Sequence, residues 1–187
     1  MLTIITPCSR PENLQKIYNS IQFDKIHKWI IVYDTTKGRT YKKSFEGYPK
    51  ITEVECDDAG GYGNQQRNYG MSLVDDGFIY FLDDDNIIHL NFWRMLDDEI
   101  TDEKYFYTFN QYRCCENSVL FGSVVALERI DTAMYIVHKK HIKDIKWDAD
   151  KYQADGMFIF DILRENPDCH KFVNTFACYH NYLNTLK

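Results

Sequence analysis

The sequence lacks the features of several common protein classes. Its 187 residues carry 22 lysines and arginines against 28 acidic residues, which gives a formal net charge of −6. Proteins that coat nucleic acid need a basic surface, so we do not expect nucleic acid as a partner. No run approaches the roughly 20 apolar residues that a membrane-spanning helix requires. None of the six cysteines belongs to a CxxC pair, which argues against a zinc knuckle.

Two further absences narrow the choice of cofactor and location. The first apolar run, residues 2–6, is followed by Pro7 and has no basic residue before it, which predicts a strand and not a signal peptide. We therefore expect reduced thiols and a cytoplasmic location. No GxGxxG follows this strand, which argues against a dinucleotide dehydrogenase. The glycine-rich, basic first loop of a sugar nucleotidyltransferase is missing as well.

What the sequence does contain indicates one globular α/β domain over residues 1–187. Apolar residues make up 44% of the chain and aromatic residues 16%. The first half alternates strand, helix, strand, strand, helix, strand, which predicts a mixed, mainly parallel sheet flanked by helices. We expect strands at residues 2–6, 28–33, 51–54, 78–82, 105–109, 123–127, 132–137 and 172–179. We expect helices after Ser9, as a possible N-cap, and at residues 64–74, 90–100 and 154–164.

An acidic triplet, Asp83-Asp84-Asp85, directly follows the strongest predicted strand, the unbroken apolar run at residues 78–82. In open α/β sheets, ligands bind beyond the carboxyl ends of strands. Alternate residues of an extended chain point the same way, so Asp83 and Asp85 can face one ion while Asp84 faces elsewhere. Such carboxylates repel one another and suit Mg²⁺ or Mn²⁺. The alternative is a solvated acidic turn.

Five segments carry a resemblance to a known family. They are residues 4–11 (IITPCSRP), 29–34 (WIIVYD), 66–68 (QRN), 79–86 (IYFLDDDN) and 130–133 (IDTA), with weaker matches at Asp155 and at residues 179–180. In this order they resemble the GT-A glycosyltransferases. The similarity is greatest to the β-1,3-glucuronyltransferases and looser to the inverting transferases of family 2.

The resemblance implies a GT-A type fold, with a nucleotide-binding half at residues 1–86 and an acceptor-binding half at residues 87–187. It implies a metal-dependent, inverting glycosyltransferase that moves a sugar from a nucleotide-diphosphate donor, UDP first, to a glycan or other hydroxyl acceptor. The cofactor would be Mn²⁺ or Mg²⁺. The degenerate alternative is a GT-A domain that binds nucleotide sugar or a partner without turnover. A DxD phosphatase is a further alternative. Such an enzyme would place its DxD motif after an earlier strand, whereas the triplet here follows the fourth predicted strand.

The resemblance also assigns roles to individual residues. Asp85, with Asp83, would bind the metal, and Asp155 would be the catalytic base. The nucleotide sugar would be bound by Thr6, Arg10, Asp34, Arg67, Asn68, Asp83, Asp84, Asp131 and His180. Among these, Asp34 would contact uracil and Asp84 the ribose. Two features depart from the family: Asp155 stands in place of glutamate, and Gly61-Tyr62-Gly63 replaces basic residues that help to bind the donor.

Several of these residues keep a second interpretation. Asp155 could serve only as an acid at a helix N-terminus, with Asp148, Asp150 and Asp161 as rival bases. Arg67 could form a plain ion pair, and His180 could be an ordinary hydrogen-bonded histidine. Trp147 could stack on a sugar or be a buried anchor. Residues 60–63 could be a lid or a simple turn. We expect His138 and His141, which flank lysines, to be solvated.

Overall fold

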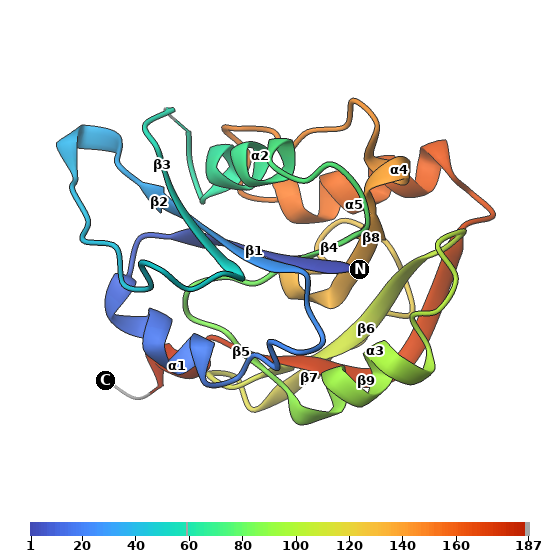
Figure 1. Ribbon diagram of the computed structural model, residues 1–187. Helices are drawn as coiled ribbons and strands as arrows, with labels where there is room; N and C mark the ends of the chain where they lie inside the picture. Colours follow the sequence, from blue (N-terminus) through green and yellow to red (C-terminus); the bar gives the residue numbers. More distant parts are fainter. Residues whose placement is uncertain (59, 186–187) are drawn as a thin grey trace.

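The computed structural model describes residues 1–58 and 60–185. These residues form one nine-stranded mixed sheet with helices on both faces (Figure 1). The strands are β1 (Leu2–Cys8), β2 (Lys28–Asp34), β3 (Ile51–Cys56), β4 (Phe78–Phe81), β5 (Ile87–Ile88), β6 (Phe106–Arg113), β7 (Ser118–Leu120), β8 (Tyr135–His138) and β9 (His170–His180). The helices are α1 (Leu14–Tyr18), α2 (Asn64–Ser72), α3 (Leu90–Asp98), α4 (Lys139–Ile142) and α5 (Ala154–Glu165). Short 3-10 turns are η1 (Pro11–Asn13), η2 (Thr36–Gly38), η3 (Thr132–Met134) and η4 (Tyr182–Asn184).

The first half of the chain forms the parallel part of the sheet. Strand β1 pairs in parallel with β2 on one side and β4 on the other, and β2 pairs in parallel with β3. Every residue of β1 and β4 is buried, as expected for strands that are covered on both faces. Because these strands run the same way, the segments that follow them meet at one edge of the sheet. That edge carries Ser9, Arg10, Asp34 and the acidic triplet.

The second half extends the sheet with mixed pairing. Strands β8 and β6 are added antiparallel, β9 lies parallel to β6, and β5 pairs antiparallel with β9. The short strand β5 begins two residues after Asp85. Its pairing with β9 therefore places the end of β9 next to the acidic triplet. Asn181 N donates to Asn86 Oδ1 at 2.8 Å, and Leu183 N donates to the Asp85 carbonyl at 3.0 Å. The chain after β9 is therefore fixed to the triplet.

Two hydrophobic cores lie on opposite faces of the sheet. Helices α1 and α3 cover one face, whereas α2, α4 and α5 cover the other (Figure 1). On β4, Tyr80 packs into the first core and Phe81 into the second. Burial of each large side chain contributes roughly 1.5–3 kcal/mol, so these cores stabilise both layers. The predicted α/β sheet flanked by helices is confirmed.

The local predictions fail at four places. Residues 123–127 are a loop, with Val124 and Leu127 half exposed, because no neighbouring strand pairs with them. Residues 132–134 form η3, so the predicted strand begins only at Tyr135. The Ser9 side chain does not cap a helix but donates to Asp84. The short strands β5 and β7 were not predicted, since two or three residues carry no periodicity.

His138 and His141 are buried, contrary to the prediction from their lysine neighbours. His141 bridges Asn166 Oδ1 and the Glu103 carbonyl through its two ring nitrogens, at 3.2 and 3.1 Å. Burial lowers the pKa of His138. Lys140 is exposed, whereas Lys139 is half-buried and donates to the Met71 carbonyl at 2.7 Å, so lysine neighbours do not place these histidines in solvent.

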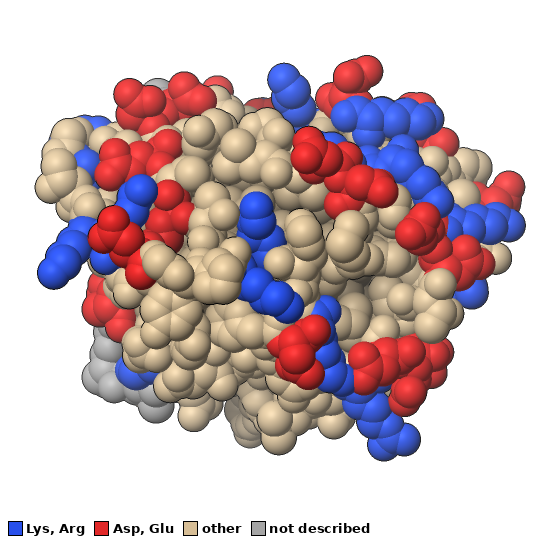
Figure 2. Space-filling view, in the orientation of Figure 1, with Lys and Arg blue, Asp and Glu red and all other residues tan. Residues whose placement is uncertain are grey.

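The surface agrees with the charge balance of the sequence. Figure 2 shows acidic and basic side chains intermingled on one face of the molecule, with no continuous basic area there. Within residues 1–58 and 60–185, the helices are all too short or too polar to cross a bilayer.

Candidate functional site

Asp84 ties the end of β4 to the turn after β1. Its carboxylate accepts hydrogen bonds from Ser9 N at 2.6 Å, Arg10 N at 2.7 Å and Arg10 Nε at 2.7 Å, and it also contacts Arg10 Nη2. The residue is only 2% exposed. Both of its oxygens thus accept hydrogen bonds from protein groups. Asp84 also lines the first cavity described below, and the ribose contact that the resemblance implies for it stays a prediction.

Asp85 lies on the other side of the Arg10 guanidinium. Arg10 Nη1 is 2.9 Å from Asp85 Oδ2, and Asn184 Nδ2 donates to the same oxygen at 2.9 Å. Among the described residues, no hydrogen bond engages Oδ1. Burial raises the pKa of Asp85, and the neighbouring Asp83 raises it further. The second oxygen is therefore available to a cation.

Arg67 holds Asp83 from helix α2. Its Nη2 pairs with Asp83 Oδ1, and its Nη1 donates to the Tyr62 carbonyl at 2.7 Å. The guanidinium carbon lies 4.6 Å from the centre of the Trp147 ring, which is itself stacked on Phe158. Of the alternatives for these two residues, the geometry realises the ion pair and the buried anchor. Arg67 braces the acidic loop against the core.

His180, at the end of β9, faces Asp131. Its Nε2 lies 3.3 Å from Asp131 Oδ2, and the other Asp131 oxygen accepts from Thr132 N at 2.6 Å. Both side chains are mostly buried. Residues that are far apart in sequence thus form one polar pair beside the triplet.

Asp155 lies in the first turn of α5, where its Oδ1 accepts from Gly156 N at 2.7 Å. Burial, followed by the nearby charge of Asp131, raises the pKa of Asp155 to about 7. The rival bases are placed elsewhere: Asp148, Asp150 and Asp161 do not line either cavity described below. Among the four candidates, Asp155 alone faces the site.

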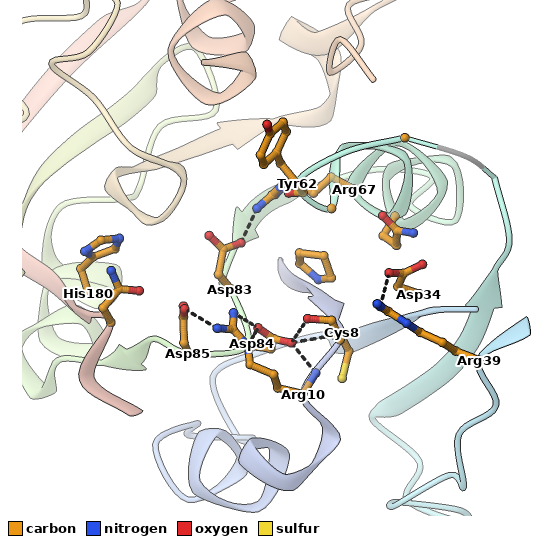
Figure 3. A pocket seen from close by; sticks show the side chains of 16 residues that line it. Cys8, Arg10, Asp34, Arg39, Tyr62, Arg67, Asp83, Asp84, Asp85 and His180 are labelled. Atoms are coloured by element: carbon orange, nitrogen blue, oxygen red, sulfur yellow. Dashed lines mark hydrogen bonds and ion pairs between the residues drawn. The ribbon is translucent and has the colours of Figure 1, made fainter. Parts of the chain in front are cut away.

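A first cavity of about 350 Å³ lies at the carboxyl edge of the parallel strands. Figure 3 shows Asp34 on one side of the acidic triplet and His180 on the other. Asp34 accepts from Thr36 N at 3.0 Å and pairs with Arg39 at 2.9 Å. The lining residues are Pro7, Cys8, Ser9, Arg10, Asp34, Arg39, Gly60, Tyr62, Gly63, Gln66, Arg67, Asp83, Asp84, Asp85, His180 and Asn181.

A second cavity of about 370 Å³ adjoins the first. It is lined by Asn64, Arg113, Leu120, Glu128, Ile130, Asp131, Thr132, Trp147, Tyr152, Gln153 and Asp155, together with residues that it shares with the first cavity. The shared wall consists of Tyr62, Arg67, Asp83, His180 and Asn181. Two ligands bound in the two cavities would therefore meet at Asp83.

Two predicted site residues do not reach either cavity. The Thr6 side chain is fully buried and accepts a hydrogen bond from Trp29 Nε1 at 2.9 Å. Asn68 pairs with the Trp147 backbone in both directions, each at 2.9 Å. Conversely, Arg39, Arg113, Tyr152 and Asn181 line the cavities without having been predicted. None of them belongs to one of the sequence motifs, so only the folded chain brings them to the site.

The described residues contain no group of three or more histidine, cysteine, aspartate and glutamate side chains that could hold a metal ion by themselves. Magnesium-type sites commonly use one or two carboxylates and leave the remaining positions to phosphates and water. The assignment of a metal to Asp85 and Asp83 stays a prediction.

The chain has a GT-A-like fold, and solved structures share it. The Staphylococcus aureus protein TarS, as residues 1–349, matches with a TM-score of 0.69 at 13% identity over 96% of this chain. TarS 1–349 in complex with UDP-GlcNAc matches with a TM-score of 0.67 at 12% identity over 95% of this chain. The complex with UDP gives a TM-score of 0.65 at 12% identity over 95% of this chain.

These matches cover 60%, 57% and 59% of the respective TarS chains, so the present chain spans less than two thirds of their length. At such low identity the likeness establishes the fold alone. No protein-family model matches the chain, and no curated protein matches it in sequence. The closer relationship to β-1,3-glucuronyltransferases stays a prediction.

Proposed function

We propose that this chain is a metal-dependent, inverting glycosyltransferase with a nucleotide-diphosphate sugar, UDP first, as donor. The observation that carries the proposal is the wall shared by the two cavities, which contains Asp83, Arg67 and His180. Glycosyl transfer needs a donor and an acceptor in contact at the reacting carbon. Two adjoining cavities that meet at an acidic loop satisfy this requirement.

The first cavity suits the nucleotide. Its lining comes from residues 7–85 and from His180 and Asn181, which supports residues 1–86 as the nucleotide-binding half. The Asp34 carboxylate would accept the imide N–H of uracil, and the Arg10 guanidinium would lie beside the phosphates. TarS shares the fold and has been solved with UDP and UDP-GlcNAc, which supports the choice of nucleotide.

Asp85, with Asp83, would hold Mn²⁺ or Mg²⁺. Two observations support this fit: Asp85 Oδ1 has no hydrogen-bond partner within the described residues, and burial beside Asp83 raises the Asp85 pKa. A buried carboxylate with a raised pKa gains from a cation. When bound, the metal would supply neutralisation of charge on the leaving diphosphate.

Asp155 is the proposed base in the second cavity. The acceptor hydroxyl would lose its proton to the Asp155 carboxylate as its oxygen attacks the anomeric carbon, and a single displacement would invert the configuration. A base with a pKa of about 7 is close to the optimum for proton transfer near neutral pH. Asp131 would orient His180 through their 3.3 Å contact, so that the imidazole faces the donor's diphosphate.

Calorimetric titration with UDP, with and without Mn²⁺, tests the proposal, followed by a screen of nucleotide sugars for Mn²⁺-dependent hydrolysis. We expect Mn²⁺-dependent UDP binding and hydrolysis of at least one donor. Binding without hydrolysis or transfer would favour a degenerate GT-A domain. Phosphate release from an aryl phosphate would favour the phosphatase.

A further inference from the structure

Two exposed tyrosines stand together at the rim of the second cavity. Tyr62 is 62% exposed and Tyr152 is 77% exposed, and their ring centres are 5.2 Å apart in an edge-to-face arrangement. Tyr152 lines only the second cavity, whereas Tyr62 lies on the wall between the two cavities. Paired aromatic rings at a cavity rim are a common feature of ligand sites.

The loops that carry these tyrosines are bound to each other. Gly61 N donates to the Ala149 carbonyl at 2.8 Å, and Asn64 Nδ2 donates to the carbonyls of Asp148 and Lys151 at 2.7 and 2.9 Å. These bonds hold the two loops together before any ligand arrives, and so keep the two tyrosines next to each other. The arrangement is therefore preorganised, which lowers the entropic cost of binding.

Tyr62 adopts a backbone conformation that its residue type disfavours. Its φ is 61°, in the left-handed region, and the Arg67 side chain holds its carbonyl. Gly63 follows with a φ of 78°, and a Cβ there would meet Pro7 Cβ at 2.9 Å. Such conformations persist where the surroundings enforce them, and they cluster at ligand sites. The strain places the Tyr62 ring at the junction of the cavities.

The charged side chains that line the second cavity are mainly acidic. Glu128, Asp131 and Asp155 line the cavity, and Arg113, its remaining cation besides Arg67, is paired with Glu116 at 3.0 Å. Phosphate or carboxylate groups would be repelled by this lining. Neutral hydroxyl groups would instead donate hydrogen bonds to the carboxylates.

We infer that Tyr62 and Tyr152 form an aromatic platform for a neutral pyranose ring of the acceptor, which makes the acceptor a carbohydrate. A pyranose has an apolar C–H face, which can pack on an exposed tyrosine ring, and a hydroxylated rim, which can donate to the carboxylates of the cavity. The inference rests on the proposed function, since it assigns the acceptor of the same site. It favours neutral sugars over phosphorylated or uronic acid acceptors.

Saturation-transfer NMR with free glycosides tests the platform. The probes are the methyl β-glycosides of glucose, galactose, N-acetylglucosamine and glucuronic acid, applied to the wild-type protein with UDP and the diamagnetic ion Mg²⁺. We expect at least one neutral glycoside to bind and the glucuronide to bind more weakly. Tyr152→Ala should weaken binding of that glycoside roughly tenfold, and Tyr152→Trp should retain it.

The control is Tyr69→Ala, which removes a partly exposed tyrosine of α2 that lines neither cavity. UDP affinity is measured for each variant and should not change in Tyr152→Ala. Failure of all neutral glycosides to bind a protein that binds UDP would overturn the platform but not the proposed function. Equal binding by wild type and Tyr152→Ala, or preference for the glucuronide, would overturn it too. Glycoside binding without UDP binding would contradict the donor assignment alone.

Discussion

The guanidinium of Arg10 lies with Nη1 2.9 Å from Oδ2 of Asp85. The same side chain binds Asp84 through Nε and Nη2. One arginine therefore neutralises two neighbouring acids of the triplet within the protein itself. Arg10 contacts Asp85 through Oδ2, so a cation could bind the same carboxylate through Oδ1.

Arg10→Ala should destabilise the protein. Asp84 would keep its backbone hydrogen bonds but lose its charged partner, and we expect a loss of about 1–3 kcal/mol in the free energy of unfolding. Mn²⁺ should recover part of this loss, because it supplies positive charge at Asp85. Thermal unfolding with and without Mn²⁺ measures both effects. Arg94→Ala is the control, since its contact with Asp98 is solvent exposed and worth little. Equal effects of the two substitutions would contradict a special role for Arg10.

Asp155→Asn should keep UDP binding and lose about 100- to 10,000-fold in transfer rate. Transfer by the wild-type protein should rise with pH through about 7, because the deprotonated carboxylate is the base. The pH profile of kcat/KM measures this, with Asp161→Asn as a control outside both cavities. Retained turnover in Asp155→Asn would move the base to another residue.

The same raised pKa has a consequence for stability. Because folding raises the Asp155 pKa from 3.8 to about 7, the stabilisation that this group contributes is fully present below 3.8 and is lost as pH rises toward 7. Asp155→Asn should therefore gain stability relative to wild type as pH increases over that range. Urea unfolding at both ends of the range tests the sign. A constant difference between the two proteins would show that the environment of Asp155 does not shift its pKa.

The sequence predicts those parts of the fold that depend on apolar runs. Residues 29–33 and 78–81 are unbroken and apolar, and both lie in strands where they are buried. Residues 123–127 have a similar composition, but their place in the fold offers no pairing strand. Strand formation there depends on tertiary contacts that composition does not encode.

The site was predictable where its residues are local in sequence. The position of the triplet directly after a buried strand follows from the sequence, but its side-chain directions do not: β4 ends at Phe81, Asp84 and Asp85 lie in a turn, and both contact Arg10. The pairing of Asp131 with His180 and the stacking of Arg67 on Trp147 join segments that are distant in sequence. Only the assembled sheet determines which of these side chains meet.

The most direct test of the account is calorimetric titration of Asp85→Ala with UDP in Mn²⁺. Removal of a side chain that only hydrogen-bonds to a metal ligand costs about 10- to 100-fold in metal affinity. Removal of Asp85, the proposed ligand itself, should cost at least as much. We expect the wild-type protein and Asp24→Ala, which removes an exposed acid, to bind UDP in a Mn²⁺-dependent manner. Asp85→Ala should remain folded and lose that dependence. Unchanged, Mn²⁺-dependent affinity in Asp85→Ala would contradict the metal site at the triplet.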